Sequence, residues 1–188
     1  MEIRNGDIVI RPLKEEDKFR LAKWLSDPVV LQYYEGRDSP FTIEMVEEKF
    51  INQSDEAVRC IFIFKGKEIG YVQYYPIDEE EWIKYGYNKA NEVIYGTDQF
   101  IGETDYWNRG IGTLLIDALK NYLVGTLGVD RLVMDPMVWN ERAIKCYEKC
   151  GYRKVKILPQ NELHEGVTHD AWLVEYADEH NYKKVVKQ

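Results

Sequence analysis

The sequence lacks any long uncharged apolar segment. A run of about 18 consecutive apolar residues, the length that a membrane-spanning helix needs, is absent from its 188 residues. The first residues, Met1 to Arg4, also lack the apolar core of a secretory signal peptide. We therefore expect a cytoplasmic protein that has no membrane partner.

Cysteine and histidine are also scarce, with three of each in the chain. Cys60, Cys146 and Cys150 are an odd number without metal-ligand spacing, and the last two lie one turn apart on a predicted helix. Free cysteine commonly packs as a small hydrophobe, which is the simpler interpretation of this pair. The sequence therefore predicts neither a disulfide framework nor a metal site.

Positive charge is in deficit, because 25 Lys and Arg residues face 33 Asp and Glu residues and leave a net charge of −8. This balance excludes nucleic acid as a partner, since its phosphates need a basic face. An acidic surface instead attracts cations, although a solvated surface is the simpler explanation of any single acidic cluster. The length fits one domain over residues 1–188, in which we expect 177–188 to be a polar tail.

A glycine-rich turn is the most informative segment that the chain does contain. It follows an apolar segment at 93–101, precedes an amphipathic pattern at 111–123, and reads Arg109-Gly110-Ile111-Gly112-Thr113. Its glycines let the backbone approach an anion, toward which the first N–H groups of the helix point. No lysine follows Gly112, and two glycines are too few for a dinucleotide fingerprint. The sequence predicts a phosphate cradle, with turn geometry alone as the alternative.

Asp98 lies in the middle of the predicted strand at 93–101, where Asp is disfavoured and a buried charge is costly unless it is paired. Gly96 also weakens the strand, and a glycine there often marks a bulge or the close approach of a ligand. Local violations of this kind gather at functional sites. We therefore expect this strand to carry function as well as packing.

The rest of the chain alternates strands and helices, and the strand, helix and strand from 93 to 135 form a parallel crossover. The pattern therefore predicts an α/β fold. The predicted elements are, in order, a strand at 8–13, two helices, strands at 58–64 and 69–75, a long acidic and aromatic excursion at 76–91, the strand at 93–101, the helix at 111–123, a strand at 131–135, a helix capped by Asn140, a strand at 152–158, an acidic loop at 160–170 and a strand at 172–176.

This order resembles the GNAT superfamily of acetyl-CoA-dependent N-acetyltransferases over nearly the whole chain. The resemblance rests on the turn at 109–113 and on the segment from Asn140 to Tyr152. It implies a mixed, mostly antiparallel sheet with a parallel crossover and flanking helices, and acetyl-CoA as co-substrate without a metal. Trp107 is a departure, because the superfamily usually has Gln or Arg there. The cofactor-binding residues that the resemblance implies are Phe100, Ile101, Arg109, Gly110, Ile111, Gly112, Thr113, Asn140 and Tyr147.

Within the superfamily, the chain resembles the aminoglycoside 6′-N-acetyltransferases, and among them the acetyltransferase half of the bifunctional aminoglycoside-modifying enzymes. The segments that carry this likeness include 95–102, 69–73 and 162–166. The resemblance implies acetyl transfer to the 6′-amine of a polycationic aminoglycoside, hence antibiotic resistance, by a monomer or homodimer. The substrate-binding residues are then Tyr95, Asp98, Asp135, Glu165 and Asp170.

The chemistry of the reaction assigns two catalytic candidates. An amine that attacks a thioester must be unprotonated, and the leaving thiolate benefits from a proton. Asp98 is the candidate to accept the ammonium proton, directly or through water. Its ordinary pKa of about 3.9 lies far below that of an amine, so either burial raises this pKa or Asp98 serves mainly as counterion and positioner of the ammonium. Tyr147 matches the superfamily's tyrosine near the cofactor sulfur and is the candidate proton donor, with a core tyrosine as the alternative. Asn140 is explained equally well by a pantetheine contact and by a helix N-cap.

Two other functions compete with this interpretation. A GNAT enzyme for another amine, such as a polyamine, a siderophore precursor or a protein N-terminus, would share the cofactor residues and differ on the acceptor side. A non-catalytic module that binds acyl-CoA or a drug would not need Asp98 and Tyr147. Replacement of Asp98 by Asn separates an enzyme from such a module, because a pure binder would lose little.

Overall fold

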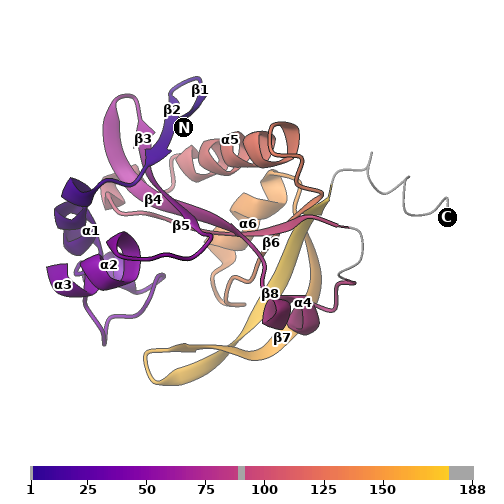
Figure 1. The fold of residues 1–188 in the computed structure, drawn as a ribbon. Helices are drawn as coiled ribbons and strands as arrows, with labels where there is room; N and C mark the ends of the chain where they lie inside the picture. The colour runs from indigo at the N-terminus through magenta and orange to yellow at the C-terminus, as the bar shows by residue number, and fades with distance from the viewer. Residues whose placement is uncertain (1, 89–91, 178–188) are drawn as a thin grey trace.

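The chain is built on one eight-stranded sheet, shown in Figure 1. The computed structural model describes residues 2–88 and 92–177, and within them the strands lie in the order β1-β2-β3-β4-β5-β6-β8-β7. The pair β5 and β6 is parallel, and the other neighbours are antiparallel. The strands are β1 (Ile3–Asn5), β2 (Ile8–Pro12), β3 (Val58–Phe64), β4 (Lys67–Pro76), β5 (Ile94–Ile101), β6 (Arg131–Met134), β7 (Arg153–His164) and β8 (Val167–Ala177).

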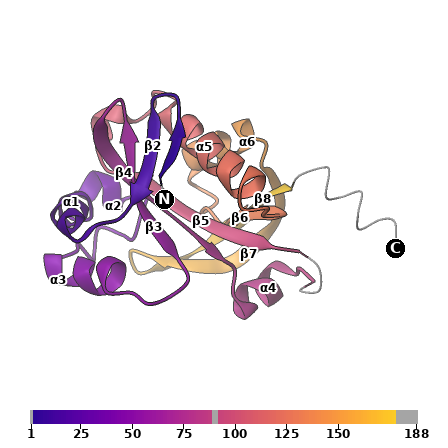
Figure 2. The ribbon, with the colours of Figure 1, turned by 45° about the horizontal axis from the view of Figure 1, so that its top comes forward.

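Helices cover both faces of this sheet, with α1 to α3 on one face and α5 and α6 on the other (Figure 2). Strand alternation supplies both cores: Cys60 and Phe62 pack beneath α5, whereas Ile61 between them packs beneath α1 to α3. The α-helices are α1 (Lys18–Trp24), α2 (Pro28–Leu31), α3 (Ile43–Val46), α4 (Glu79–Tyr85), α5 (Ile111–Gly125) and α6 (Glu141–Lys149), and shorter helical turns occupy Glu15–Asp17, Glu47–Ile51 and Thr104–Tyr106.

The parallel pair is short, and this positions the site. β5 pairs with β6 only from Ile94 to Gly96, whereas its pairing with β4 continues to Ile101. From Thr97 onward, no strand within residues 2–88 and 92–177 pairs with β5 on the β6 side. Asp98 and Gln99 lie on this open stretch, where the sheet offers room between two strands.

The predicted fold is confirmed: the sheet is mixed, mostly antiparallel, and flanked by helices. The sequence pattern missed β1, which pairs with β2 through the turn at Gly6 and Asp7. The excursion at 76–91 contains α4, which Asp78 caps by accepting the N–H of Glu81. Most of the predicted tail lies outside the described residues. None of the described helices is both long and apolar enough to cross a membrane.

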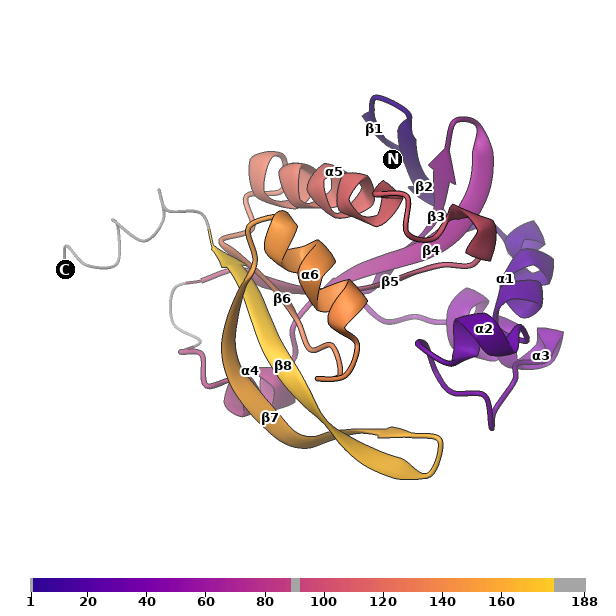
Figure 3. The same ribbon diagram turned by 180° about the vertical axis from the view of Figure 1, so that it is seen from behind.

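The prediction of an acidic loop at 160–170 is wrong. β7 and β8 continue through this region as a long hairpin that runs past the end of β6 (Figure 3). Its turn is formed by Glu165 and Gly166, whose φ values of 51° and 78° are those of a tight two-residue hairpin turn. Glu162 and Asp170 therefore stand on strands, and Glu165 stands at a tight turn, rather than on a long loop.

Candidate active site

The turn between β5 and α5 presents an uncapped helix N-terminus. Gly110 precedes α5 with a φ of 74°, a left-handed conformation that favours glycine, and no side chain of the described residues caps the helix. A Cβ atom at Gly110 would meet nothing within 4 Å, whereas one at Gly112 would lie 3.4 Å from Sγ of Cys146. The backbone of this turn is consequently open toward solvent at Gly110 and closely approached by α6 at Gly112.

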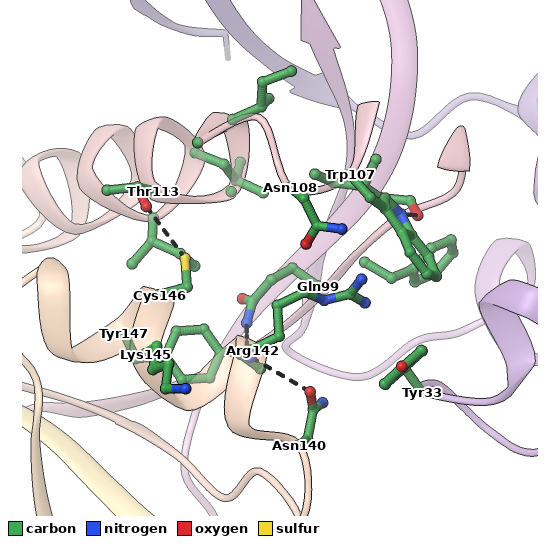
Figure 4. Close-up of a pocket in the computed structure, with 18 of the residues that line it drawn as sticks. Tyr33, Gln99, Trp107, Asn108, Thr113, Asn140, Arg142, Lys145, Cys146 and Tyr147 are labelled. Atoms are coloured by element: carbon green, nitrogen blue, oxygen red, sulfur yellow. Dashed lines mark hydrogen bonds between the residues drawn. The ribbon is translucent and has the colours of Figure 1, made fainter. Parts of the chain in front are cut away.

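A cavity of about 680 Å³ lies in front of this turn, and Figure 4 shows the residues that line it. Its charged lining side chains are Arg109, Arg142, Lys145 and Lys149, against Glu141, so we call it the basic cavity. All the residues predicted to bind the cofactor line it, and their roles stay predictions. They are Phe100, Ile101, Arg109, Gly110, Ile111, Gly112, Thr113, Asn140 and Tyr147.

Arg142 carries a positive charge from α6 to the opposite wall of the basic cavity. Its guanidinium carbon lies 4.1 Å from the ring centre of Trp107 and 4.5 Å from that of Tyr33. The Trp107 indole is fixed in turn by a 2.8 Å hydrogen bond to the carbonyl of Ile101. Trp107, the departure from the superfamily pattern, is therefore a platform for an arginine from another element (Figure 4).

A second cavity, of about 460 Å³, adjoins the first. Its charged lining side chains are Glu35, Asp98, Asp135 and Glu162, against Lys84, and we call it the acidic cavity. These carboxylates come from the segment after α2, from β5, from the end of β6 and from β7, so only the assembled sheet brings them together. The residues that line both cavities are Tyr33, Tyr34, Gln99, Asn140 and Tyr147.

Asp98 is held in the acidic cavity by its neighbours on β4. Its Oδ2 accepts a 2.7 Å hydrogen bond from Nε2 of Gln73, the residue opposite it in the sheet, and the Tyr75 hydroxyl also bonds to it. Burial raises the pKa of Asp98 above its usual value, the Gln73 bond opposes the rise, and the charge of Asp135 adds to it. Gly96 leaves room for this arrangement, because its Cβ would lie 2.7 Å from the ring of Tyr75.

Tyr147 stands where the two cavities meet. Its hydroxyl accepts a 2.8 Å hydrogen bond from Nε2 of Gln99, which leaves its own proton free to be donated elsewhere (Figure 4). Burial raises the pKa of this phenol well above its usual range, so it is protonated at neutral pH. Asn140 caps α6 by accepting the N–H of Ala143, and it also lines both cavities. The structure is therefore compatible with a helix N-cap and with a pantetheine contact.

Two further carboxylates of the acidic cavity, Asp135 and Glu162, differ in their surroundings. Asp135 accepts hydrogen bonds from the Tyr85 hydroxyl at 3.2 Å and from Asn161 at 3.0 Å. Glu162 was not among the predicted site residues. Burial, and then the charges of Asp135 and other acids, raise the pKa of Glu162 from 4.5 to about 7.

Three residues predicted to bind substrate lie outside both cavities. Tyr95 packs against Tyr74 in the core, with ring centres 6.5 Å apart. Glu165 is engaged by Arg37, whose Nε lies 2.6 Å from Oε1 and whose hydrogen bonds lower the pKa of that carboxyl to about 2. Asp170 accepts the backbone N–H of Gln160 at 2.9 Å. The structure does not bring these residues to Asp98, and their contact with a substrate stays a prediction without support from the geometry.

Some of the missed site residues do carry a recognisable signal in the sequence. Gln73 and Gln99 are polar side chains inside mostly apolar strands, which is the signal that singled out Asp98. Glu162 was hidden by the wrong loop prediction. Glu35 follows α2 with a φ of 69°, a backbone feature that composition does not reveal. Among the described residues, no three His, Cys, Asp or Glu side chains are grouped so that they could hold a metal ion.

Known proteins share this sequence pattern. Residues 14–159 match the family described as Acetyltransferase (GNAT) domain. Aminoglycoside N(6′)-acetyltransferase type 1 of Klebsiella pneumoniae is 26% identical over 155 residues, which cover 80% of this chain and 76% of that protein. A kanamycin resistance protein of Rhizobium radiobacter is 36% identical over 61 residues, which cover 32% of this chain and 56% of that protein.

Solved structures share the fold. AAC(6′)-Ib in complex with ribostamycin and coenzyme A has a TM-score of 0.74 at 23% identity, covering 95% of this chain and 97% of that one. A spermidine N-acetyltransferase SpeG chimera from Vibrio cholerae and hSSAT has a TM-score of 0.72 at 16% identity, covering 97% of this chain and 100% of that one. The family match spans most of the chain, and this protein therefore belongs to the GNAT family of acetyltransferases.

Proposed function

We propose that this chain acts as one acetyltransferase domain that transfers the acetyl group of acetyl-CoA to the 6′-amino group of aminoglycosides and thereby confers resistance. The observation that supports this is the meeting of a basic and an acidic cavity at Gln99, Asn140 and Tyr147. An anionic, phosphate-bearing thioester suits the basic cavity, and a polycationic amine suits the acidic one. The reacting groups would then meet at the shared wall.

The basic cavity fits acetyl-CoA. The uncapped first turn of α5 and the side chains of Arg109 and Arg142 supply donors for phosphate, and neither arginine has a carboxylate partner among the described residues. Gln99 Oε1 is buried without a hydrogen-bond partner among those residues. Such an acceptor is suited to take an amide or ammonium N–H from a ligand.

Asp98 and Tyr147 would divide the proton transfers. Asp98 accepts a proton from the substrate ammonium, directly or through water, so that the amine nitrogen can bond to the thioester carbonyl carbon. As the carbon–sulfur bond breaks, Tyr147 donates its hydroxyl proton to the departing thiolate, and the second proton that the nitrogen loses on becoming an amide returns through water to the tyrosine oxygen. Gln99 holds the Tyr147 oxygen from one side, which directs that proton away from Gln99 and toward the junction.

The acidic cavity also distinguishes between acceptors. Its volume of about 460 Å³ and its walls of Tyr33 and Tyr34 suit a ring-bearing polycation better than a slender polyamine. The relatives from Klebsiella pneumoniae and Rhizobium radiobacter are named for aminoglycosides. The likeness to a spermidine acetyltransferase reaches the fold only.

The test is thiol release from acetyl-CoA with kanamycin, spermidine and a peptide amine as acceptors, followed by NMR of the product. We expect rapid release with kanamycin, an acetyl group on its 6′ nitrogen, and a higher kanamycin tolerance in bacteria that express the chain. Release with spermidine or the peptide alone would assign the enzyme to another amine. Binding of acetyl-CoA without any release would favour a binding module.

A further inference from the structure

A chain of hydrogen bonds leads from the protein core to Asp98. The Tyr71 hydroxyl donates to Oε1 of Gln73 at 2.7 Å, and Nε2 of Gln73 donates to Oδ2 of Asp98 at 2.7 Å. Tyr71 and Gln73 are two positions apart on β4, so their side chains leave the same face of the sheet. Gln73 and Asp98 are direct partners across β4 and β5. The three side chains therefore form one continuous relay.

Tyr71 is a core residue. Its side chain is 0% exposed, its ring stacks on Phe100 with centres 5.7 Å apart, and Phe50 packs edge-on against it at 5.2 Å. It lines neither the basic nor the acidic cavity. Burial raises the pKa of its phenol far above the usual range, so its hydroxyl keeps its proton. Packing fully accounts for an aromatic ring here, but it does not account for the hydroxyl.

The hydroxyl decides which way the Gln73 amide faces. In the observed orientation, the amide accepts from Tyr71 and donates to Asp98, so both of its ends are satisfied. The reversed orientation would set the carbonyl oxygen of Gln73 against the Asp98 carboxylate, where two acceptors repel each other. Removing the Tyr71 hydroxyl leaves the carbonyl of Gln73 without its donor and weakens this preference.

Asp98 needs such support because its other neighbours oppose ionisation. Burial raises its pKa, and the acids around it add to the rise, while the hydrogen bonds from Gln73 and Tyr75 lower it. Lys84, which also lines the cavity, lies 3.7 Å from Asp135. The titratable and charged groups that face Asp98 are Tyr34 and Glu35 after α2, Tyr71 and Tyr75 of β4, Glu81, Lys84 and Tyr85 of α4, Asp135 after β6, Tyr147 of α6 and Glu162 of β7.

We propose that Tyr71 is a positioning residue for acetyl transfer, which acts through Gln73 to orient the Asp98 carboxylate and to keep it ionised. The inference rests on the proposed function only in the role it gives to Asp98; the relay itself is a property of the free protein. A buried tyrosine on the far side of the sheet from α5 thereby sets the charge of a group in the acidic cavity.

The test is the titration of Asp98 in protein labelled with ¹³C at aspartate carboxyl groups, its signal being assigned by its loss in Asp98→Asn. We expect Tyr71→Phe to move the Asp98 midpoint to higher pH by about one unit, because the Gln73 amide that donates to the ionised form loses the hydroxyl that holds its orientation. Gln73→Met should move it at least as far. The double variant should match Gln73→Met alone, since Tyr71 acts only through Gln73.

Tyr74→Phe is the matched control, because it removes a buried hydroxyl from the opposite face of the same strand. It should leave the Asp98 midpoint unchanged. A Tyr71→Phe variant that titrates like the wild type would overturn the proposal, and so would a double variant whose shift is the sum of the two single shifts. Should Tyr71→Phe fail to fold, a Gln73→Met midpoint equal to that of the wild type would overturn it on its own.

The same variants separate this proposal from the proposed function. If kanamycin is the substrate, the acid limb of the kcat/KM profile should move with the NMR midpoint in Tyr71→Phe and stay in place in Tyr74→Phe. If kanamycin is not acetylated, the proposed function fails, while the NMR titration still decides whether the relay exists. An NMR shift without a matching shift of the acid limb in an active enzyme would remove the catalytic part of the proposal.

Discussion

The Glu162 carboxyl group shares the acidic cavity with the carboxyl groups of Glu35, Asp98 and Asp135. Burial and these charges raise its pKa from 4.5 to about 7, so its ionised form is disfavoured in the folded protein. In the unfolded chain the same group would ionise at its ordinary pKa. Above the folded pKa, this carboxylate therefore destabilises the free protein, in exchange for a cavity that attracts cations.

We expect Glu162→Gln to stabilise the free protein near pH 8 and to leave it unchanged near pH 4. The contribution of Glu162 to wild-type stability falls as pH rises from 4.5 to about 7, because this group ionises first in the unfolded chain, and the loss is complete above that range. The rise in the pKa of Glu162, discounted because the side chain is partly exposed, corresponds to a difference of about 1 to 2 kcal/mol in the free energy of unfolding. Urea unfolding of both proteins at the two pH values measures it.

Glu16→Gln is the matched control, because it removes the same charge from a side chain that is 72% exposed. It should change the free energy of unfolding by less than about 0.5 kcal/mol at either pH. A gain in Glu162→Gln that persists near pH 4, or one that Glu16→Gln reproduces, would contradict the assignment to a destabilised carboxylate in the acidic cavity.

Asp98 can be tested by an isosteric change. We expect Asp98→Asn to lower kcat well over tenfold while acetyl-CoA binding is retained, because the residue lines the acidic cavity and not the basic one. The amide keeps the shape of the side chain but cannot accept the ammonium proton. Steady-state kinetics and calorimetric titration with acetyl-CoA measure the two effects. Unchanged turnover would remove Asp98 from the mechanism.

For single residues, the sequence reveals a site residue when its side chain departs from the polarity expected of the strand or helix in which it lies. Asp98 interrupts an apolar strand, so it was found, and Gln73 and Gln99 carry a weaker form of the same signal. Glu162 and Glu165 are chemically alike in the sequence, yet one lines the acidic cavity and the other pairs with Arg37. Composition cannot separate them, because the difference arises from strand orientation and from contacts distant in the chain.

Among the elements, β5 and the turn after it organise the candidate active site. The free edge of β5 from Thr97 onward carries Asp98 toward one cavity and Phe100 toward the other. The same strand then leads into the uncapped N-terminus of α5. A single strand–turn–helix unit thereby positions the proposed proton acceptor and the proposed phosphate cradle, which is why one short segment carried most of the sequence signal.

We expect Gly110→Val to lower acetyl-CoA affinity at least tenfold. The φ of 74° at Gly110 is a conformation that a β-branched residue rarely adopts, so the turn must rearrange and displace the N–H groups that face the basic cavity. Calorimetric titration with acetyl-CoA measures the affinity, and urea unfolding measures the accompanying loss of stability.

Gly6→Val provides the matched control for the backbone strain. Gly6 has a φ of 57°, and a Cβ there would also meet nothing within 4 Å, but it lies in the turn between β1 and β2. A similar loss of stability with normal acetyl-CoA affinity is expected. Equal losses of affinity in both variants would mean that Gly110 acts through general stability and that the phosphate cradle lies elsewhere.

The sequence predicted helices and strands well where the apolar periodicity and the capping residues indicate the same element. It predicted them poorly where pairing between strands distant in the chain determines the structure. The helix at 111–123 and the crossover to β6 followed from local apolar periodicity, and both are present. The segment at 160–170 was predicted as a loop because its polar residues hide the alternation of an exposed hairpin. Glu165 and Gly166 were the local turn signal, but only pairing with β8 makes Glu162 a wall of the acidic cavity.

For the whole molecule, the net charge of −8 does not reveal that two neighbouring cavities have lining residues of opposite net charge. The basic cavity gathers Arg109, Arg142, Lys145 and Lys149, whereas four carboxylates line the acidic cavity beside it. Composition could predict the attraction of a cation, but not that an anion would be received next to it. The fold achieves this by bringing α6 to one side of the shared wall and β7 to the other.

We expect the kcat/KM for a polycationic acceptor to fall about tenfold when ionic strength rises from about 0.1 to about 1 M, with acetyl-CoA saturating throughout. The reason is that the distance over which salt screens charges falls from about 10 to about 3 Å. Two double variants, compared at pH 8 where Glu162 is above its folded pKa of about 7 and mostly ionised, separate net charge from the cavity. They are Glu35→Gln with Glu162→Gln, and the distant Glu2→Gln with Glu16→Gln, and each is about two charges less negative than the wild type. The cavity pair should flatten the salt dependence and the distant pair should preserve it. Equal flattening would assign the attraction to the net charge of the protein, because both pairs change that charge by the same amount.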